Sequence, residues 1–174
     1  MKKIALIFWP EGGNAESVAD KLYSRFNENE IEKVSVAKVT KELLNDSDFW
    51  IVGGSTVGSH VWEDADDSNR WHFFFKLLEG IEMPKKTVAF YGLGDQVLYP
   101  HHFVDGLGVF QVEFEKRNAK IVGNWPVKGY EFTDSDGMKD DVFFGLAIDE
   151  DSQPEFTDER IDKWLAIVKS EFGL

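Results

Sequence analysis

The sequence predicts an α/β fold in which a five-stranded parallel sheet carries helices on both faces. Short apolar runs alternate about five times with stretches of helical periodicity, the pattern of repeated strand–helix–strand units. Most of these runs are continuously apolar, as expected of strands that are covered on both sides. The length of 174 residues fits one domain, residues 1–174.

Five apolar segments are expected to form the strands. Residues 4–9 and 49–52 are continuous apolar runs, which indicates strands buried on both faces. Residues 34–39 alternate between apolar and polar side chains, which favours a less buried edge strand. Residues 87–91 and 119–123 complete the set.

Between the strands, apolar residues recur at the spacing of a helix face. Asn14 is expected to cap the first helix, and Thr157 to open the last, with Asp158 and Glu159 in its first turn. The apolar positions of the four clearest helices are Val18, Ala19, Leu22, Tyr23 and Phe26; Trp71, Phe74, Phe75 and Leu78; Phe103, Leu107, Phe110 and Phe114; and Ile161, Trp164, Leu165, Val168 and Phe172.

One segment does not follow the alternation of strands and helices. Residues from about 125 to 144 are rich in Asp, Gly and Thr and have no helical period. We therefore expect an insertion (about 125–144) before or within the last strand.

Composition and charge exclude several classes of function. The chain has no cysteine, which excludes a disulfide framework, a thiolate zinc site, an iron–sulfur cluster and a cysteine nucleophile. Its 19 basic and 32 acidic residues give a net charge of −13, so no nucleic-acid partner is expected. The first apolar run is too short for a signal peptide or a membrane helix, which favours a cytoplasmic protein without a membrane partner.

The residue patterns indicate binding rather than catalysis by the protein's own side chains. No nucleophile stands beside a base, and the adjacent His101 and His102 lack a third ligand at suitable spacing for a metal. In a sheet of this kind a ligand sits beyond the carboxyl ends of the strands. Three turns are expected there, at residues 9–15, 54–66 and 92–100, and each is rich in glycine and in small polar or aromatic residues.

The third of these turns carries a resemblance to a known family. Residues 91–100 read Tyr-Gly-Leu-Gly-Asp-Gln-Val-Leu-Tyr-Pro and resemble the GxGDQxxY flavin loop of long-chain flavodoxins. Residues 129–132, 144–149 and 157–161, the last followed by Trp164, are also typical of that branch. The resemblance covers essentially the whole chain. It implies a flavodoxin-like doubly wound sheet of order 2-1-3-4-5 and an electron carrier, not an enzyme, that holds flavin mononucleotide (FMN) without a covalent bond.

The resemblance also implies which residues would contact the flavin. Tyr99 would stack on the outer face of the isoalloxazine, and Asp95 would line its pyrimidine edge or simply form a turn. Val57 falls at the inner-face position, with Trp9 and Trp62 as the alternatives for that face, and Gly58 matches the position whose peptide flips toward flavin N5. The full set implied for cofactor binding is Trp9, Pro10, Glu11, Gly12, Gly13, Asn14, Ala15, Ser55, Thr56, Val57, Gly58, Gly92, Leu93, Gly94, Asp95, Tyr99 and Asp149.

The first turn departs from the family pattern. The family's phosphate loop reads [ST]-x-[ST]-G-x-[ST], but Pro10, Gly12 and Ala15 replace all three hydroxyl residues here, and Glu11 adds a negative charge. Backbone N–H groups and the Asn14 side chain remain as donors at a helix start that favours anions. Two hypotheses stay open: an FMN electron carrier, or a flavodoxin-fold protein with weakened or lost FMN binding that takes a riboflavin-type flavin or acts through protein contacts.

Negative charge is concentrated in the later part of the chain. Residues 1–58 have a net charge of −2 and residues 59–174 of −11, with acidic clusters at 63–67 and 149–151. If these clusters surround a flavin, they lower its reduction potential. They would also steer it to basic docking faces of redox partners of the flavodoxin reductase or low-potential oxidoreductase type. The alternative is that the acidic loops only keep a small, monomeric protein in solution.

Overall fold

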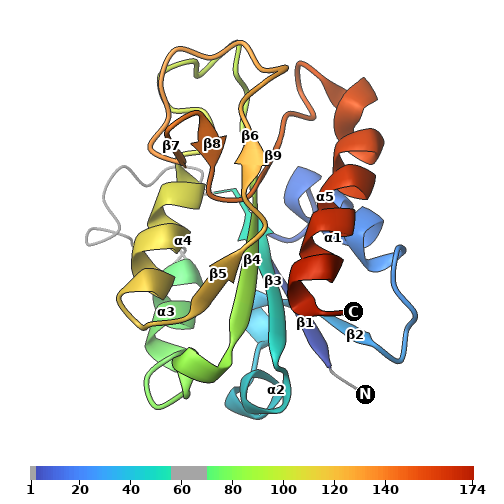
Figure 1. Cartoon of the computed structure of the whole chain (residues 1–174), viewed down its shortest axis with the longest axis vertical. Helices are drawn as coiled ribbons and strands as arrows, with labels where there is room; N and C mark the ends of the chain where they lie inside the picture. The colour runs from blue at the N-terminus through green and yellow to red at the C-terminus, as the bar shows by residue number, and fades with distance from the viewer. Residues whose placement is uncertain (1–2, 56–69) are drawn as a thin grey trace.

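The computed structural model describes residues 3–55 and 70–174 and contains a parallel sheet wrapped by helices (Figure 1). The strand order is β2-β1-β3-β4-β5, and every neighbouring pair is parallel, so the expected order 2-1-3-4-5 is confirmed. The strands of this sheet are β1 (Ile4–Trp9), β2 (Ile31–Ser35), β3 (Phe49–Gly54), β4 (Thr87–Leu93), β5 (Lys120–Val122) and β9 (Leu146–Ile148).

The last position of the sheet is divided between two short strands. β5 pairs with the first half of β4, and β9 pairs with its second half. The chain between them forms a small antiparallel sheet of order β6-β8-β7, which Figure 1 places at the end of the molecule where the parallel strands finish. Its strands are β6 (Trp125–Pro126), β7 (Met138–Lys139) and β8 (Val142–Phe143). The segment without helical period therefore interrupts the last strand.

Helices cover both faces of the sheet. Figure 1 shows α1 and α5 together on one side and α3 and α4 together on the other. The helices are α1 (Asn14–Tyr23), α2 (Lys41–Asp46), α3 (Arg70–Leu77), α4 (Gly106–Glu115) and α5 (Thr157–Phe172), with short 3-10 turns at Val36–Lys38, Met83–Lys85 and Pro154–Phe156. None of the helices in the described ranges is long and apolar enough to cross a membrane.

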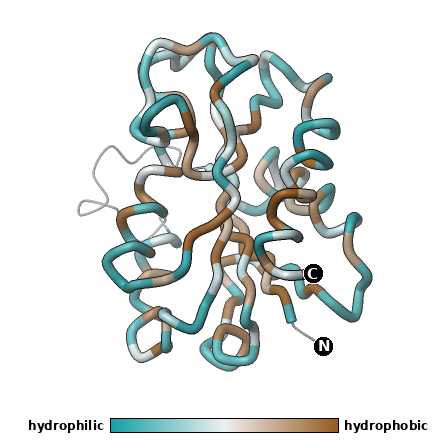
Figure 2. Tube along the Cα trace, viewed as in Figure 1, coloured by the Kyte–Doolittle hydropathy of each residue, from teal (hydrophilic) through white to brown (hydrophobic). Residues whose placement is uncertain are grey.

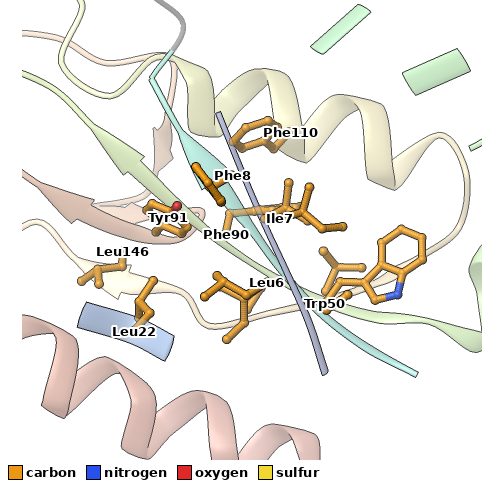
Figure 3. Close-up of a cluster of buried hydrophobic side chains, with 14 of the residues drawn as sticks. Leu6, Ile7, Phe8, Leu22, Trp50, Phe90, Tyr91, Phe110 and Leu146 are labelled. Atoms are coloured by element: carbon orange, nitrogen blue, oxygen red, sulfur yellow. The ribbon is translucent and has the colours of Figure 1, made fainter. Parts of the chain in front are cut away.

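The core lies on both faces of the central strands. Leu6 and Leu146 lie on the same side of the sheet as Leu22 of α1, whereas Phe110 lies on the α4 side (Figure 3). Figure 2 shows the same division along the whole trace, with hydrophobic residues on the central strands and hydrophilic ones on the loops. Each such fully buried side chain contributes roughly 1.5–3 kcal/mol relative to exposure. The continuous apolar runs thus form strands that are covered on both sides.

Several sequence predictions about element bounds are wrong, among them Phe26 and Leu78, which lie just beyond the ends of α1 and α3. The edge strand is β2, which ends at Ser35, because the Ser35 hydroxyl accepts the Ala37 N–H (3.2 Å) and turns the chain into a 3-10 helix. The first helix is capped by Gly13 without a side-chain hydrogen bond, so Asn14 is its first residue and not its cap. Phe103 precedes α4 and is buried against Phe132 and other aromatic rings of the interrupting segment.

Helix α2 has no counterpart among the predicted elements. It has six residues, too few to display helical periodicity. Its start is fixed by the Thr40 hydroxyl, which accepts the Leu43 N–H at 3.2 Å. The feature of the sequence that could have predicted α2 is therefore the capping residue Thr40 and not an apolar pattern.

Candidate functional site

A cavity of about 650 Å³ opens at the carboxyl ends of β1, β3 and β4. This volume is in the range of small-molecule sites. Nine residues of the set implied by the resemblance line it: Pro10, Asn14, Ala15, Ser55, Gly92, Leu93, Gly94, Asp95 and Tyr99. A second hollow, of about 470 Å³, lies near the amino ends of β1 and β2, is lined largely by charged side chains, and contains none of that set.

The other residues of the implied set are placed differently. Trp9 ends β1, and Glu11, Gly12 and Gly13 follow in the first turn, next to the cavity lining but not part of it. Asp149 is fully buried behind the third turn. Val57, expected at the inner face, and Gly58, expected to carry the peptide flip, lie outside the described residues. Thr56, Trp62 and the acidic cluster 63–67 lie outside them as well.

Asp95 builds the third turn from within. Its Oδ1 accepts the N–H groups of Val97 and Leu98, both at 2.9 Å, and the Ser152 hydroxyl at 3.2 Å. These bonds, the Leu98 amide first, lower the pKa of the Asp95 carboxyl despite some burial. The backbone oxygen of Asp95 also accepts the Tyr99 N–H at 2.9 Å. The carboxylate therefore stays ionised and fixes where Tyr99 leaves the turn, while its contact with a pyrimidine edge stays a prediction.

Tyr99 stands in solvent at the mouth of the cavity. Its exposed fraction is 63%, and the preceding Val97 and Leu98 are 68% and 70% exposed. Three consecutive large apolar side chains held open on a braced turn are typical of a surface that contacts a ligand or a partner. An exposed tyrosine ring lining a cavity is suited to stack on a flat heterocycle.

Asp149 braces the third turn from behind. Its Oδ2 accepts the backbone N–H and the side-chain amide of Gln96, at 3.1 and 2.7 Å, and its Oδ1 accepts the N–H groups of Asp151 and Ser152. The Gln96 Oε1 in turn accepts the Glu131 N–H at 2.5 Å. One buried carboxylate thus joins the third turn, the 149–152 loop and the interrupting segment. Its observed role is structural, and direct contact with a ligand stays a prediction.

Gly94 allows the third turn to approach the segment before α4. A Cβ at this position would lie 2.8 Å from the Phe103 ring and 2.9 Å from the Val104 nitrogen. Val104 itself has a φ of 50°, an unusual value for a β-branched residue, and it lines the cavity. The glycine expected from the motif is therefore required for backbone packing beside the site.

The first turn has fewer internal bonds. Gly12 has a φ of 78°, and its N–H donates to the Glu16 carboxylate at 2.7 Å. Glu11 pairs with Lys38 at 3.6 Å, and a hydrogen bond with Ser35, followed by that lysine, lowers the pKa of Glu11. Glu11 therefore has a cationic neighbour outside the turn.

The rim of the cavity is acidic. Asp95, Asp105, Glu150 and Asp151 all line it. Burial, followed by repulsion from the carboxylates around it, raises the pKa of Asp151. His102 lies on the same rim with its Nδ1 2.9 Å from the Asp105 carboxylate. Across residues 3–55 and 70–174, no group of three or more histidine and acidic side chains is arranged to hold a metal ion.

This geometry suits a planar aromatic ligand with an anionic tail. The third turn offers an exposed ring and a fixed backbone, and Asn14 and Ala15 at the start of α1 line the same cavity. Comparison with known proteins decides which family uses this arrangement: the Flavodoxin family model matches residues 6–164.

The chain belongs to the flavodoxin family. A flavodoxin of Picosynechococcus is 39% identical over 175 residues, with all of both chains covered. A flavodoxin of Klebsiella pneumoniae is also 39% identical and covers 100% of this chain and 97% of its own. Among solved structures, the Fusobacterium nucleatum flavodoxin bound to flavin mononucleotide superposes with a TM-score of 0.84 at 25% identity, covering 98% of this chain and 99% of that one.

Several cavity residues were absent from the predicted set. They are Gly54, His102, Val104, Asp105, Gly106, Glu150 and Asp151. His102, Val104 and Asp105 follow the flavodoxin motif directly, so extending the predicted third turn by a few residues would have included them. Gln96 lies inside the quoted motif, but its buried partnership with Asp149 depends on a contact across 53 positions that a local pattern does not reveal.

Proposed function

We propose that this flavodoxin carries electrons on a non-covalently bound FMN between redox partner proteins and catalyses no reaction of its own. The observation that carries the proposal is the cavity at the carboxyl ends of the strands, lined by the flavin-loop motif with Tyr99 exposed at its mouth. Full-length similarity to flavodoxins favours this function over the alternative of a flavodoxin fold that has lost FMN.

The ring and the phosphate of the cofactor would lie at opposite ends of the cavity and contact different residues. FMN supplies the redox chemistry when bound. Tyr99 would stack on the ring, and Asp95 with the Gly92–Gly94 backbone would hold the third turn against it. Pro10, Asn14 and Ala15 line the other end, where the start of α1 would face the phosphate. We also propose that the middle turn contacts the cofactor through Thr56, Val57 and Gly58. Ser55, which precedes them, lines the cavity.

The acidic rim supports a further part of the proposal, the nature of the partners. Asp95, Asp105, Glu150 and Asp151 would surround the exposed edge of the flavin. Such a rim would steer the carrier to basic docking faces of a flavodoxin reductase or a low-potential oxidoreductase, with rates that fall as salt rises. We propose that the carrier is a monomer formed by a single domain, 1–174. A cytoplasmic location fits a chain that folds without cysteine.

Titration of the purified apoprotein with FMN tests the proposal. A supporting result is a yellow complex whose flavin fluorescence is quenched and whose flavin is reversibly reduced by a low-potential donor. A protein that stays colourless and leaves FMN fluorescence unchanged at every concentration overturns the electron-carrier function but not the fold.

A further inference from the structure

A buried arginine of α5 joins two segments that meet at the third turn. Arg160 is 8% exposed and is not part of the cavity lining. Arg25 and Arg117 pair with carboxylates, whereas in residues 3–55 and 70–174 the hydrogen bonds of Arg160 go to neutral oxygens, and its Nη1 has no partner. Its guanidinium lies 3.9 Å from the centroid of the Tyr130 ring. Burying a cation without a paired anion costs free energy, so the contacts that remain define what this arginine contributes.

The hydrogen bonds of Arg160 connect the interrupting segment to the loop before α5. Its Nη2 donates to the Gly129 carbonyl oxygen at 3.2 Å and to the Gln153 Oε1 at 2.6 Å. The Gln153 Nε2 donates to the same Gly129 oxygen at 3.2 Å. These three residues form a closed set of hydrogen bonds, so Arg160 fixes the two segments relative to each other.

Both segments also hold Gln96, which lies in the third turn. The Glu131 N–H, two residues after Gly129, donates to the Gln96 Oε1 at 2.5 Å. On the other side, the Gln153 N–H donates to the Asp149 carbonyl oxygen at 3.1 Å, and the Asp149 carboxylate accepts the Gln96 Nε2 at 2.7 Å. The oxygen of the Gln96 amide is thus held by one segment and its nitrogen by the other, and Arg160 joins these two segments.

We propose that Arg160 is a positioning residue that fixes the third turn, and with it Tyr99, without contacting the flavin itself. The inference rests on the proposed function and concerns the ring end of that site. Gln96 lies three residues before Tyr99 in the turn. Without Arg160 the two segments would lose their shared donor and could shift relative to each other, and the Gln96 amide could then follow only one of them. Tyr99 would occupy more positions and stack less well on any isoalloxazine ring.

Arg25 provides a matched contrast. It links α1 to α5 through hydrogen bonds of 2.8 Å to Asp158 and Asp162, and it also donates to the Lys21 carbonyl oxygen at 2.8 Å. Within the described chain these three partners do not line the cavity. A general loss of α5 packing would appear in both R25M and R160M, whereas a loosened third turn should appear in R160M alone.

Hydrogen exchange of the apoproteins, followed by NMR, tests the proposal without a flavin. The N–H groups of Gln96, Tyr99 and Glu131 report on the turn, and that of Leu6 in β1 reports on global unfolding. Beyond any change at Leu6, we expect the three amides to exchange about tenfold faster in R160M and less than about twofold faster in R25M. Methionine is a good helix former, so R160M should keep α5.

A second variant keeps the test decisive if R160M is too unstable to measure. Q153A removes a partly exposed side chain that bonds both Arg160 and Gly129, and it should accelerate exchange of the same three amides by a smaller factor. Acceleration in R160M that is uniform and includes Leu6, or turn amides that are unchanged in Q153A, overturns the proposal.

Flavin titration separates this inference from the proposed function. We expect R160M to weaken FMN and riboflavin by the same factor, about fivefold, because both carry the ring that Tyr99 would contact, and R25M to weaken either by less than about twofold. Weakening of FMN alone would locate the effect at the phosphate and contradict the role of Arg160. If the unmodified chain binds neither flavin, the proposed function fails, and the exchange rates still decide whether Arg160 positions the third turn.

Discussion

The third turn and the first turn approach the same cavity but are built differently. Asp95 braces the third turn from within, and the buried Asp149 and Gln96 brace it from behind. The first turn has a single internal side-chain bond, from Gly12 to Glu16, and leaves the amides that follow it open within the described chain. The third turn is therefore fixed by its own hydrogen bonds before a ligand arrives, whereas the first turn has few bonds that fix it. Loss of the family's hydroxyl residues is confined to the end that is less constrained.

The largest expected effect comes from removing the brace behind the third turn. D149A leaves four buried or partly buried donors of Gln96, Asp151 and Ser152 without their acceptor. Each unsatisfied buried donor costs about 1–3 kcal/mol, and the costs do not simply add, so we expect a loss of roughly 3 kcal/mol or more in the free energy of unfolding. Urea unfolding measures it. E150Q is the neighbouring control, and an equal effect of the two substitutions would show that Asp149 braces nothing.

A glycine-to-alanine substitution in each turn tests the difference in rigidity between them. G94A would place a Cβ 2.8 Å from the Phe103 ring, so we expect it to destabilise by about 1–3 kcal/mol and to weaken flavin binding. A Cβ at Gly13 meets no atom within 4 Å, so G13A should cost less than about 1 kcal/mol through the weaker cap. Thermal and urea unfolding of both variants provide the values. A larger loss in G13A would contradict the difference in rigidity between the turns.

Tyr99 should affect binding without affecting folding. Because its side chain is 63% exposed, Y99A should change the free energy of unfolding by less than about 0.5 kcal/mol. Its ring should matter for the flavin, and we expect both FMN and riboflavin to bind roughly tenfold more weakly, about 1.4 kcal/mol. L98A is the matched control, since Leu98 is 70% exposed but does not line the cavity. Equal losses of flavin affinity in Y99A and L98A would contradict the stacking role of Tyr99.

Two carboxylates of the site should change the stability of the fold in opposite directions as pH falls. The pKa of Asp95 is lowered in the folded protein, so its bonds stabilise the fold at neutral pH and this contribution disappears as pH falls below about 4. The pKa of Asp151 is raised, mainly by burial and then by its acidic neighbours, so its charge destabilises the fold at neutral pH and acid relieves that effect.

Urea midpoints of D95N and D151N at pH 7 and pH 3 measure these smaller effects. At pH 7 we expect D95N to lower stability and D151N to raise it, the latter by less than about 0.5 kcal/mol because solvent screens an exposed carboxylate. At pH 3 both differences should shrink. Shifts of the same sign at pH 7 would contradict the assigned environments.

The resemblance to flavodoxins implied the order of the sheet and nine of the residues that line the cavity. Continuous apolar runs located β1, β3 and β4, because strands covered on both faces must be apolar throughout. Once these strands were placed, their carboxyl ends located the first and third turns. The local motif then supplied Gly94, Asp95 and Tyr99.

What the sequence did not supply depends on contacts between distant segments or on side-chain caps. Ser35 ended β2 through its own hydroxyl, which an alternating pattern does not reveal. The bond between Asp149 and Gln96 joins residues 53 positions apart. The Glu16 carboxylate reaches back to Gly12 across one helical turn, so a loop motif that ends at Ala15 could not include it.

The ratio of the dissociation constants of riboflavin and FMN for the unmodified apoprotein shows directly whether the ring or the phosphate dominates flavin binding. A cavity that holds the ring through a preformed third turn, while Pro10, Gly12 and Ala15 offer no hydroxyl group to the phosphate, predicts that both flavins bind and that their constants differ by no more than about tenfold. FMN binding that is thousands of times tighter than riboflavin binding would contradict it, because the phosphate would then dominate.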